Sequence, residues 1–251
     1  MRFPLTTLAV WCCAWSALIG SSARAQTIDD VIAKHIEARG GAEKIAAMKS
    51  FRQTGQLDLG NGQKATLTMA YKRPNLMRME MMVPRMPPAV RAFDGRSGWT
   101  FMPQMGKRNP ESADDATQRE LVEEADFAGP LIDWKQKGHK LELAGREQVD
   151  GKDCYKVNVT RADTREQRQY YLDPNTFLEV QVTGTQASGS FTQKLSDNKK
   201  VDGLTFPFTS VVEVVLTNGQ KQQYTYKVEK IEINPDLPDE QFIMPTTMPS
   251  K

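Results

Sequence analysis

The sequence is poor in the residue types that carry much of enzyme chemistry. Outside the first 25 residues it has two histidines, His35 and His139, and one cysteine, Cys154. None of the three lies near a catalytic serine signature or in a cysteine-rich cluster, so we expect structural or solvated histidines and a buried, inert thiol. A single thiol forms no internal disulfide, so a hydrophobic core must stabilise the chain. We therefore expect no enzyme, no bound metal and no cofactor.

The sequence also lacks an excess of charge of either sign. It contains 33 lysines and arginines and 31 aspartates and glutamates, and the first 25 residues hold two of the basic residues, Arg2 and Arg24, and no acidic one. Without those two, the remaining chain has 31 residues of each sign. This balance argues against a nucleic-acid partner and against strong electrostatic attachment to lipid head groups.

The first 25 residues have the pattern of a secretory signal peptide. Arg2 precedes a short apolar run over residues 5–19, and residues 23–25 supply the small side chains of a cleavage site. A membrane anchor is the alternative, but the apolar run is shorter than the roughly 20 residues that a spanning helix needs. We expect cleavage before Gln26 and a soluble periplasmic protein that forms one domain over residues 26–251.

Helical periodicity is found in two regions of this domain. Thr27 is suited to cap a helix with one apolar stripe, Gly40-Gly41 ends that helix, and a shorter helix follows up to Met48. The second region runs from Glu111 to Lys137, and Gly129-Pro130 divides it into two expected helical pieces. These two regions interrupt a chain that otherwise shows strand periodicity.

The rest of the domain alternates apolar and polar residues with the period of two that is typical of β-strands. Asp-Gly, Asn-Gly and proline-containing turns divide it into about twelve segments that are suited to antiparallel pairing. The size agrees with one mainly β domain. The expected strands are 51–59, 63–73, 76–83, 89–94, 98–102, 139–147, 153–162, 165–173, 177–185, 189–197, 206–217 and 220–233.

One strand is unusually rich in methionine. Because side chains alternate between the two faces of a strand, Met77, Met79 and Met81 share one face. Flexible thioether side chains suit a cavity that accepts irregular apolar ligands as well as they suit an ordinary core, and the sequence leaves both interpretations open. Neighbouring strands repeat the spacing, which predicts one apolar surface formed by Leu67, Met69, Tyr71, Met77, Met79, Met81, Trp99 and Phe101.

Copper binding is a competing interpretation of these methionines, because thioethers are soft ligands for Cu(I). Successive residues on one face of a strand, such as Met77 and Met79, are about 7 Å apart, which is too far for one ion without ligands from other strands. No histidine lies nearby in the sequence. The spacing therefore disfavours a copper site.

The segment Lys72-Arg73-Pro74-Asn75-Leu76, followed by Asp94-Gly95, Trp99 and Pro103, resembles the stretch that marks LolA-like periplasmic lipoprotein carriers, the outer-membrane lipoprotein-sorting family. Segments 170–173 and 201–207 resemble a longer branch of that family. The resemblance implies an unclosed, strongly curved antiparallel β half-barrel with helices that cover its concave face. It also implies that this face receives acyl chains.

Several functional expectations follow from the resemblance. The ligands would be acyl chains of lipoproteins or lipids, with an inner-membrane donor and an outer-membrane acceptor, and the protein would act as a monomer. The helical regions at about 28–48 and 111–137 would be lids, and Arg52 is the candidate for the arginine that helps the lid close in such carriers. A cell-envelope sensor or protein-interaction domain on the same fold is the alternative. The expected lid side chains are Leu121, Val122, Phe127, Leu131, Ile132 and Trp134.

Overall fold

The computed structural model describes residues 26–60, 62–186 and 188–246. The expected signal peptide lies outside the described residues. Within them, no helix is long and apolar enough to cross a membrane. The helices are α1 (Ile28–Arg39), α2 (Ala42–Ala47) and α3 (Asp115–Glu124), with 3-10 turns η1 (Pro103–Met105) and η2 (Asp239–Gln241).

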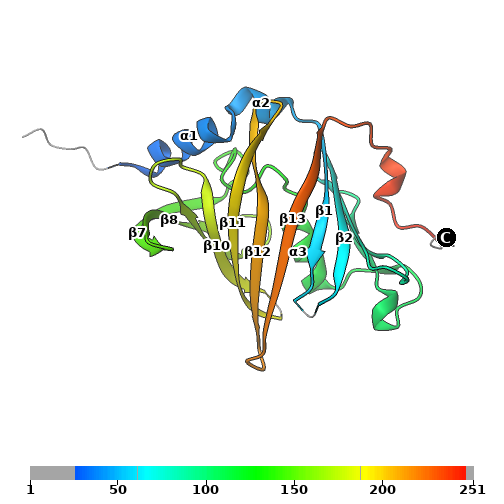
Figure 1. The fold of residues 1–251 in the computed structure, drawn as a ribbon. Helices are drawn as coiled ribbons and strands as arrows, with labels where there is room; N and C mark the ends of the chain where they lie inside the picture. The colour runs from blue at the N-terminus through cyan, green and yellow to red at the C-terminus, as the bar shows by residue number, and fades with distance from the viewer. Residues whose placement is uncertain (1–25, 61, 187, 247–251) are drawn as a thin grey trace, which may run out of the picture.

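The strands follow the expected segments closely, and Figure 1 shows their arrangement. They are β1 (Ser50–Asp58), β2 (Lys64–Lys72), β3 (Leu76–Met82), β4 (Ala89–Phe93), β5 (Gly98–Phe101), β6 (Glu111–Ser112), β7 (Lys140–Val149), β8 (Lys152–Thr160), β9 (Gln167–Leu172), β10 (Glu179–Gln186), β11 (Gly189–Val201), β12 (Leu204–Leu216) and β13 (Lys221–Ile233).

All the strands of the described chain belong to one antiparallel sheet that does not close. Its 13 strands run in the order β6-β5-β4-β3-β2-β1-β13-β12-β11-β10-β9-β8-β7. The first strand of the chain therefore pairs with the last one in the middle of the sheet, and β6 and β7 form the two edges. The predicted fold, an unclosed antiparallel half-barrel, is confirmed.

The order of the strands explains why a lid covers one face. The chain leaves one edge of the sheet after β6 and returns at the opposite edge with β7. The intervening segment 113–139, which includes α3, must therefore cross from edge to edge. In Figure 1, α3 lies behind β13 and β1, within the curve of the sheet. We call the sheet face that α2 and α3 cover the inner face and the other the outer face.

The second helical region differs from its prediction at both ends. Its first residues, Glu111–Ser112, form the short strand β6 instead of a helix. Downstream of α3, residues 126–138 form turns and no second helix. Gly129 and Asp133 have φ angles of 86° and 54°, outside the helical range, and Pro130 lacks an amide hydrogen. The apolar spacing in this segment therefore follows burial and not helix geometry.

The first helix begins and ends where the sequence predicts. The Thr27 hydroxyl accepts a hydrogen bond from the backbone amide of Asp30 at 3.2 Å, and the Asp30 carboxylate accepts one from the Thr27 amide at 3.0 Å. Gly40 ends the helix with a φ of 120°, and a Cβ there would meet the carbonyl oxygen of Gly203 at 2.5 Å. Because Gly40 has no Cβ, the end of α1 can lie directly against the β11–β12 turn.

Two hydrophobic clusters lie between the helices and the inner face. In the first, α2 and the segment 121–132 pack on β1 to β4, with Phe51, Tyr71, Met77 and Phe93 among its buried residues. In the second, α1 packs on β8 and β9 together with the following residues: Val31, Ile32, Leu131, Tyr155, Val157, Val159 and Leu172. The helices thus bury the inner face at both halves of the sheet.

Candidate functional site

The methionine strand forms part of the inner face, as the residues of β2 show. Leu67 pairs with Met81, Met69 pairs with Met79, and Tyr71 pairs with Met77 in the antiparallel register. Directly opposite residues share a face and lie side by side. Six of the eight side chains predicted for the apolar surface therefore lie together. We call these six residues the methionine face.

Burial of the methionine face decreases along β3 but not along β2, where Tyr71 and Leu67 are both buried. Met77 is fully buried, whereas Met69 and Met79 are partly buried at the border of the first cluster, and Met81 is also partly exposed. The sulfur of Met69 accepts hydrogen bonds from the Gln53 amide and the Tyr71 hydroxyl, each at 3.4 Å. The β3 part of the face thus begins in a filled core at Met77 and is only partly covered at Met79 and Met81.

The segment 113–139, which we call the lid segment, places four of its predicted side chains on the methionine-face side. Leu121 and Ile132 are buried in the first cluster, and Val122 and Phe127 pack against it. The Phe127 ring lies 5.9 Å from the Tyr71 ring. Aromatic and aliphatic contacts of this kind exclude water without fixing one geometry, so they can be exchanged for other apolar contacts.

The other two predicted lid side chains occupy the opposite half of the sheet. Leu131 is fully buried in the second cluster, and Trp134 packs against that cluster beside α1. They anchor the lid segment to β8 and β9 and do not cover methionines. The sequence could not separate the two groups, because neighbouring residues of an irregular segment can point to different halves of a sheet.

The prediction that Trp99 and Phe101 share the methionine face is wrong. Arg78 of β3 pairs with Ala92 of β4, which pairs with Trp99 of β5. Trp99 therefore lies on the outer face with Arg78, whose guanidinium carbon is 5.5 Å from the centre of the indole ring. The spacing within each strand was predicted correctly, but the pairing register across the turns decides which face each set occupies.

Phe101 lines a separate hollow at the loops beyond β3 and β5. The hollow has a volume of about 370 Å³. Three large apolar side chains in this region, Met82, Met86 and Met105, are 39%, 44% and 76% exposed. The residues that line the hollow are Met86, Pro87, Phe101, Pro103, Gln104 and Arg108.

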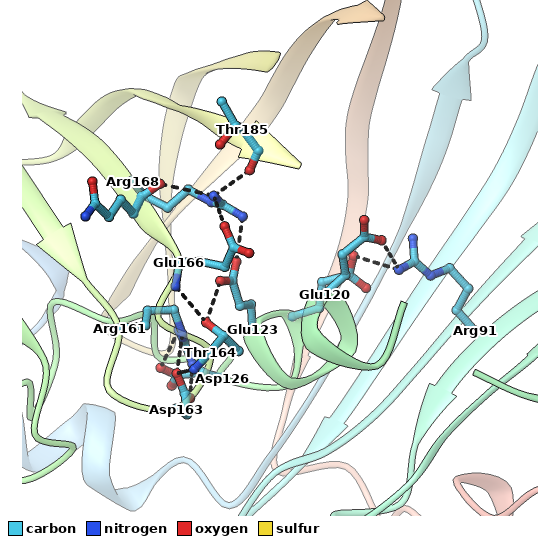
Figure 2. Close-up of polar contacts among 12 residues, drawn as sticks. Arg91, Glu120, Glu123, Asp126, Arg161, Asp163, Thr164, Glu166, Arg168 and Thr185 are labelled. Atoms are coloured by element: carbon cyan, nitrogen blue, oxygen red, sulfur yellow. Dashed lines mark hydrogen bonds and ion pairs between the residues drawn. The ribbon is translucent and has the colours of Figure 1, made fainter. Parts of the chain in front are cut away.

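Charged side chains attach α3 to the β4 side of the inner face. One nitrogen of Arg91, Nη2, lies 2.9 Å from a carboxylate oxygen of Glu120 and 3.4 Å from one of Glu124. Glu120 and Glu124 are one helical turn apart, so both can reach the same guanidinium group. Burial raises the pKa of Glu124, and the Arg91 charge opposes this shift. Figure 2 shows Arg91 and Glu120 at one end of this arrangement.

A denser polar network attaches the other side of α3 to the β8–β9 turn and to β9. Glu123 accepts hydrogen bonds from Arg168 at 3.0 Å and from the Thr164 hydroxyl at 2.9 Å. Asp126 pairs with Arg161 of the β8–β9 turn at 3.6 Å and, within the lid segment itself, with Lys137 at 2.7 Å. Figure 2 shows Glu123, Asp126, Arg161, Thr164 and Arg168 gathered at the end of α3 opposite Arg91.

Arg168 has its own site in the sheet, independent of α3. Its Nη1 donates to the backbone oxygen of Thr185 at 2.7 Å, and its guanidinium group lies over the Phe191 ring at 5.2 Å. Gly184 makes room for the side chain, because a Cβ there would lie 2.5 Å from the Arg168 Cδ. Arg168 therefore keeps several partners even without Glu123.

Arg52 does not contact the lid segment, which corrects its candidate role. Its Nη1 lies 3.6 Å from the carboxylate of Glu232 on the neighbouring strand β13. In β1 it alternates with Phe51, whose ring is in the inner cluster, so Arg52 lies on the outer face. Arg73 instead links the lid elements: it donates to the backbone oxygens of Met48 and Ile45, and its guanidinium group lies 5.1 Å from the Phe127 ring.

The histidines and the cysteine occupy structural positions. His35 is fully buried, its Nδ1 lies 2.9 Å from the backbone oxygen of Phe177, and burial lowers its pKa. His139 is buried and its Nδ1 accepts from the Ala162 amide. Cys154 is fully buried, and burial raises the pKa of its thiol. Among the described residues, no group of three or more His, Cys, Asp and Glu side chains is arranged to hold a metal ion.

A family model with the description "Uncharacterized protein" matches residues 90–245, which is more than half of the chain. The chain belongs to this family. The match begins in β4 and includes the whole lid segment and β7 to β13. No curated protein matches the chain.

Solved structures with the same fold give the second comparison. A LolA superfamily protein from Nitrosomonas europaea has a TM-score of 0.58 and 17% identity, covering 86% of this chain and 97% of its own. A DUF1329 family protein from Desulfovibrio piger has a TM-score of 0.57 and 12% identity, covering 87% and 98%. A domain named for outer-membrane lipoprotein sorting, from Vibrio parahaemolyticus, has a TM-score of 0.54 and 9% identity, covering 86% and 95%.

These likenesses establish that the chain has the LolA-like fold, and the resemblance inferred from residues 72–76 and the later turns is confirmed at that level. None of the three names describes a catalytic activity. At 9% to 17% identity, the similar structures do not identify ligand-binding residues in this chain. The ligand must be argued from the inner face itself.

Proposed function

We propose that this protein is a periplasmic carrier. It binds acyl chains of lipoproteins or lipids between the methionine face and the lid segment, and it passes them from an inner-membrane donor to an outer-membrane acceptor. It acts as a monomer after its signal peptide is removed. The fold shared with LolA superfamily and lipoprotein-sorting proteins supports the general class.

The observation that carries the proposal is the contact between the methionine face and the lid segment. Val122 and Phe127 are only partly buried, and they pack against a cluster that also borders the partly exposed Met69 and Met79. Unbranched methionines can change their conformation to fit a new apolar surface. An acyl chain that replaced these lid contacts would keep the inner face covered.

The energetics require an exchange of contacts. Burying an acyl chain of about sixteen carbons is worth on the order of 10 kcal/mol, at about 0.8 kcal/mol per methylene. A ligand held so firmly would leave into water too slowly to be delivered. Since opening the lid loses the contacts of side chains such as Leu121, the net affinity is lower, and direct transfer to an acceptor becomes possible.

A second candidate function is a cell-envelope sensor or protein-interaction domain. It is favoured by the exposed Met86 and Met105 beside the hollow at the loops, because exposed apolar side chains can mark a protein contact. The two functions differ in what copurifies with the protein. A carrier should retain lipid or lipoprotein, whereas a sensor should retain a protein partner.

Binding of a fluorescent fatty-acyl probe tests the carrier function in a matched pair of variants. Met79→Asp places a charge on the methionine face, whereas Met82→Asp places the same charge at an exposed outer position of the same strand. We expect Met79→Asp to weaken probe binding more than tenfold and Met82→Asp to leave it unchanged. Intact binding by a folded Met79→Asp variant would contradict the assignment. Mass spectrometry of material extracted from the natively purified protein identifies the class of cargo.

A further inference from the structure

Arg91 is a cation within the apolar inner face. It lies on β4 directly opposite Met79 of β3, so the two side chains are neighbours on the same face. Its side chain is 24% exposed, and its ionic partners in the described structure are Glu120 and Glu124 of α3. The Arg91 Nε and one oxygen of Glu124 are buried without a hydrogen-bond partner among the described residues.

Movement of α3 away from β4 would remove both ionic partners of Arg91. A partly buried charge that loses its partners and stays beside apolar side chains is strongly unfavourable. Arg168 on the other side does not have this problem, because Thr185 and Phe191 remain in contact with it. Only the Arg91 side of the site would therefore need a replacement anion.

The attachments of α3 favour opening on the Arg91 side. Glu123 and Asp126 attach the lid segment to the β8–β9 side through Thr164, Arg168 and Arg161. The Arg91 side has one guanidinium group and two carboxylates that are 30% and 32% exposed. The β8–β9 side holds the lid segment through three partners, whereas this side depends on a single guanidinium group, so this attachment is the weaker one.

We propose that the cargo carries an anionic group beside its acyl chain, and that this anion replaces Glu120 and Glu124 as the partner of Arg91. The inference rests on the proposed carrier function and specifies its ligand. The acyl chain lies along Met69, Met79 and Met81, and a carboxylate or phosphate oxygen takes the place of the α3 carboxylates. Neutral acyl chains would leave Arg91 without a partner and bind less tightly.

The raised pKa of Glu124 agrees with such an exchange. Burial makes the charged form of Glu124 unfavourable, so this carboxylate is a weaker partner for Arg91 than a solvated one would be. A cargo anion therefore competes with the Glu120 carboxylate and with a Glu124 carboxylate whose charged form is already unfavourable. Two oxygens of one carboxylate or phosphate can also bind the guanidinium group together, which a single close contact at Nη2 does not achieve.

Fluorescence titration with cis-parinaric acid and its methyl ester tests this inference on the purified mature protein. We expect the acid to bind about tenfold more tightly than the ester, which is the effect of a charge-assisted hydrogen bond. Arg91→Gln should abolish the preference by weakening only the acid, and Arg91→Lys should retain most of it. Arg52→Gln, the same substitution at an outer-face ion pair, should change neither affinity.

Further variants and competitors keep the outcomes distinct. Glu120→Gln with Glu124→Gln removes the competing carboxylates and should strengthen binding of the acid only, even if Arg91→Gln does not fold. Displacement of the probe by palmitate or by hexadecyl phosphate shows which anion Arg91 prefers. Equal affinity for acid and ester, or a preference that persists in folded Arg91→Gln, overturns the inference but leaves the carrier function standing. Failure of both probes to bind overturns both.

Discussion

Trp99 donates a hydrogen bond from its indole Nε1 to the backbone oxygen of Phe242 at 2.8 Å, across 143 residues of sequence. The bond lies on the outer face, where the C-terminal segment after β13 covers β2 to β5. Phe242 and Leu237 pack there on Ala70, and all three are buried. The sheet around the methionine face is therefore covered on both sides, by the lid segment inside and by the C-terminal segment outside.

Phe242→Ala should destabilise the protein by about 3–5 kcal/mol, because it removes a fully buried ring from the outer cluster. Urea unfolding followed by circular dichroism measures the change. Ile243→Ala is the matched control, since its side chain is 53% exposed and its loss should cost less than about 0.5 kcal/mol. Equal effects of the two substitutions would show that the C-terminal segment is not packed as described.

Gly98→Ala should disturb the docking of α3 on β5. A Cβ at residue 98 would lie 2.4 Å from the Leu121 Cδ1 and 2.9 Å from the Gln118 Oε1. We expect a loss of about 1–3 kcal/mol in the free energy of unfolding through overpacking. In the double variant with Leu121→Ala the colliding atom is absent. We therefore expect the double variant to lose about 1 kcal/mol less stability than the sum of the losses in the two single variants. Strict additivity would mean that the two residues are not in contact.

Phe127→Ala should make the lid segment easier to open. The Phe127 ring stacks 6.4 Å from Phe51 and lies beside Tyr71 and Arg73. Its removal weakens the closed state, so we expect stopped-flow association of the acyl probe to accelerate severalfold. Phe208→Ala removes another aromatic ring that packs against the same cluster from β12 and serves as the control. Equal acceleration in both variants would argue against opening at the lid.

Asp173 should make stability depend on pH in the acid range. Burial alone would raise the pKa of its carboxyl group, but hydrogen bonds from Lys152 and from the amides of Thr176 and Asn175 outweigh burial and lower the pKa from 3.8 to about 2. The charged form is thus favoured by folding. Its contribution, on the order of 2 kcal/mol, is present above about pH 4 and is lost as the pH falls towards 2.

Asp173→Asn tests this contribution through unfolding curves at several pH values. The variant should be less stable at pH 7 by a similar amount, and its stability should change less than that of the natural chain between pH 4 and pH 2. Asp239→Asn is the control, because that carboxylate is 64% exposed beside Lys72 and should contribute little. An unchanged acid profile in Asp173→Asn would contradict the interpretation.

Local chemistry predicted most of the elements. Thr27 as the expected cap gave the start of α1, and the turn expected between residues 59 and 63 correctly separated β1 from β2. Strand alternation placed the expected strands and the methionine face. The two-residue strand β6 and the turns after α3 were missed, because a very short strand has no period and the spacing of buried side chains in a turn segment imitates a helix.

The sequence alone determined most of the strands and which side chains share a face within each strand. Only the tertiary structure decided that Trp99 lies on the outer face, that Arg52 is remote from the lid, and that Arg91 and Arg168 hold α3 from opposite sides. The physical reason is that alternation is a property of one strand, whereas register, strand order and the path of a crossing segment depend on pairing between distant residues.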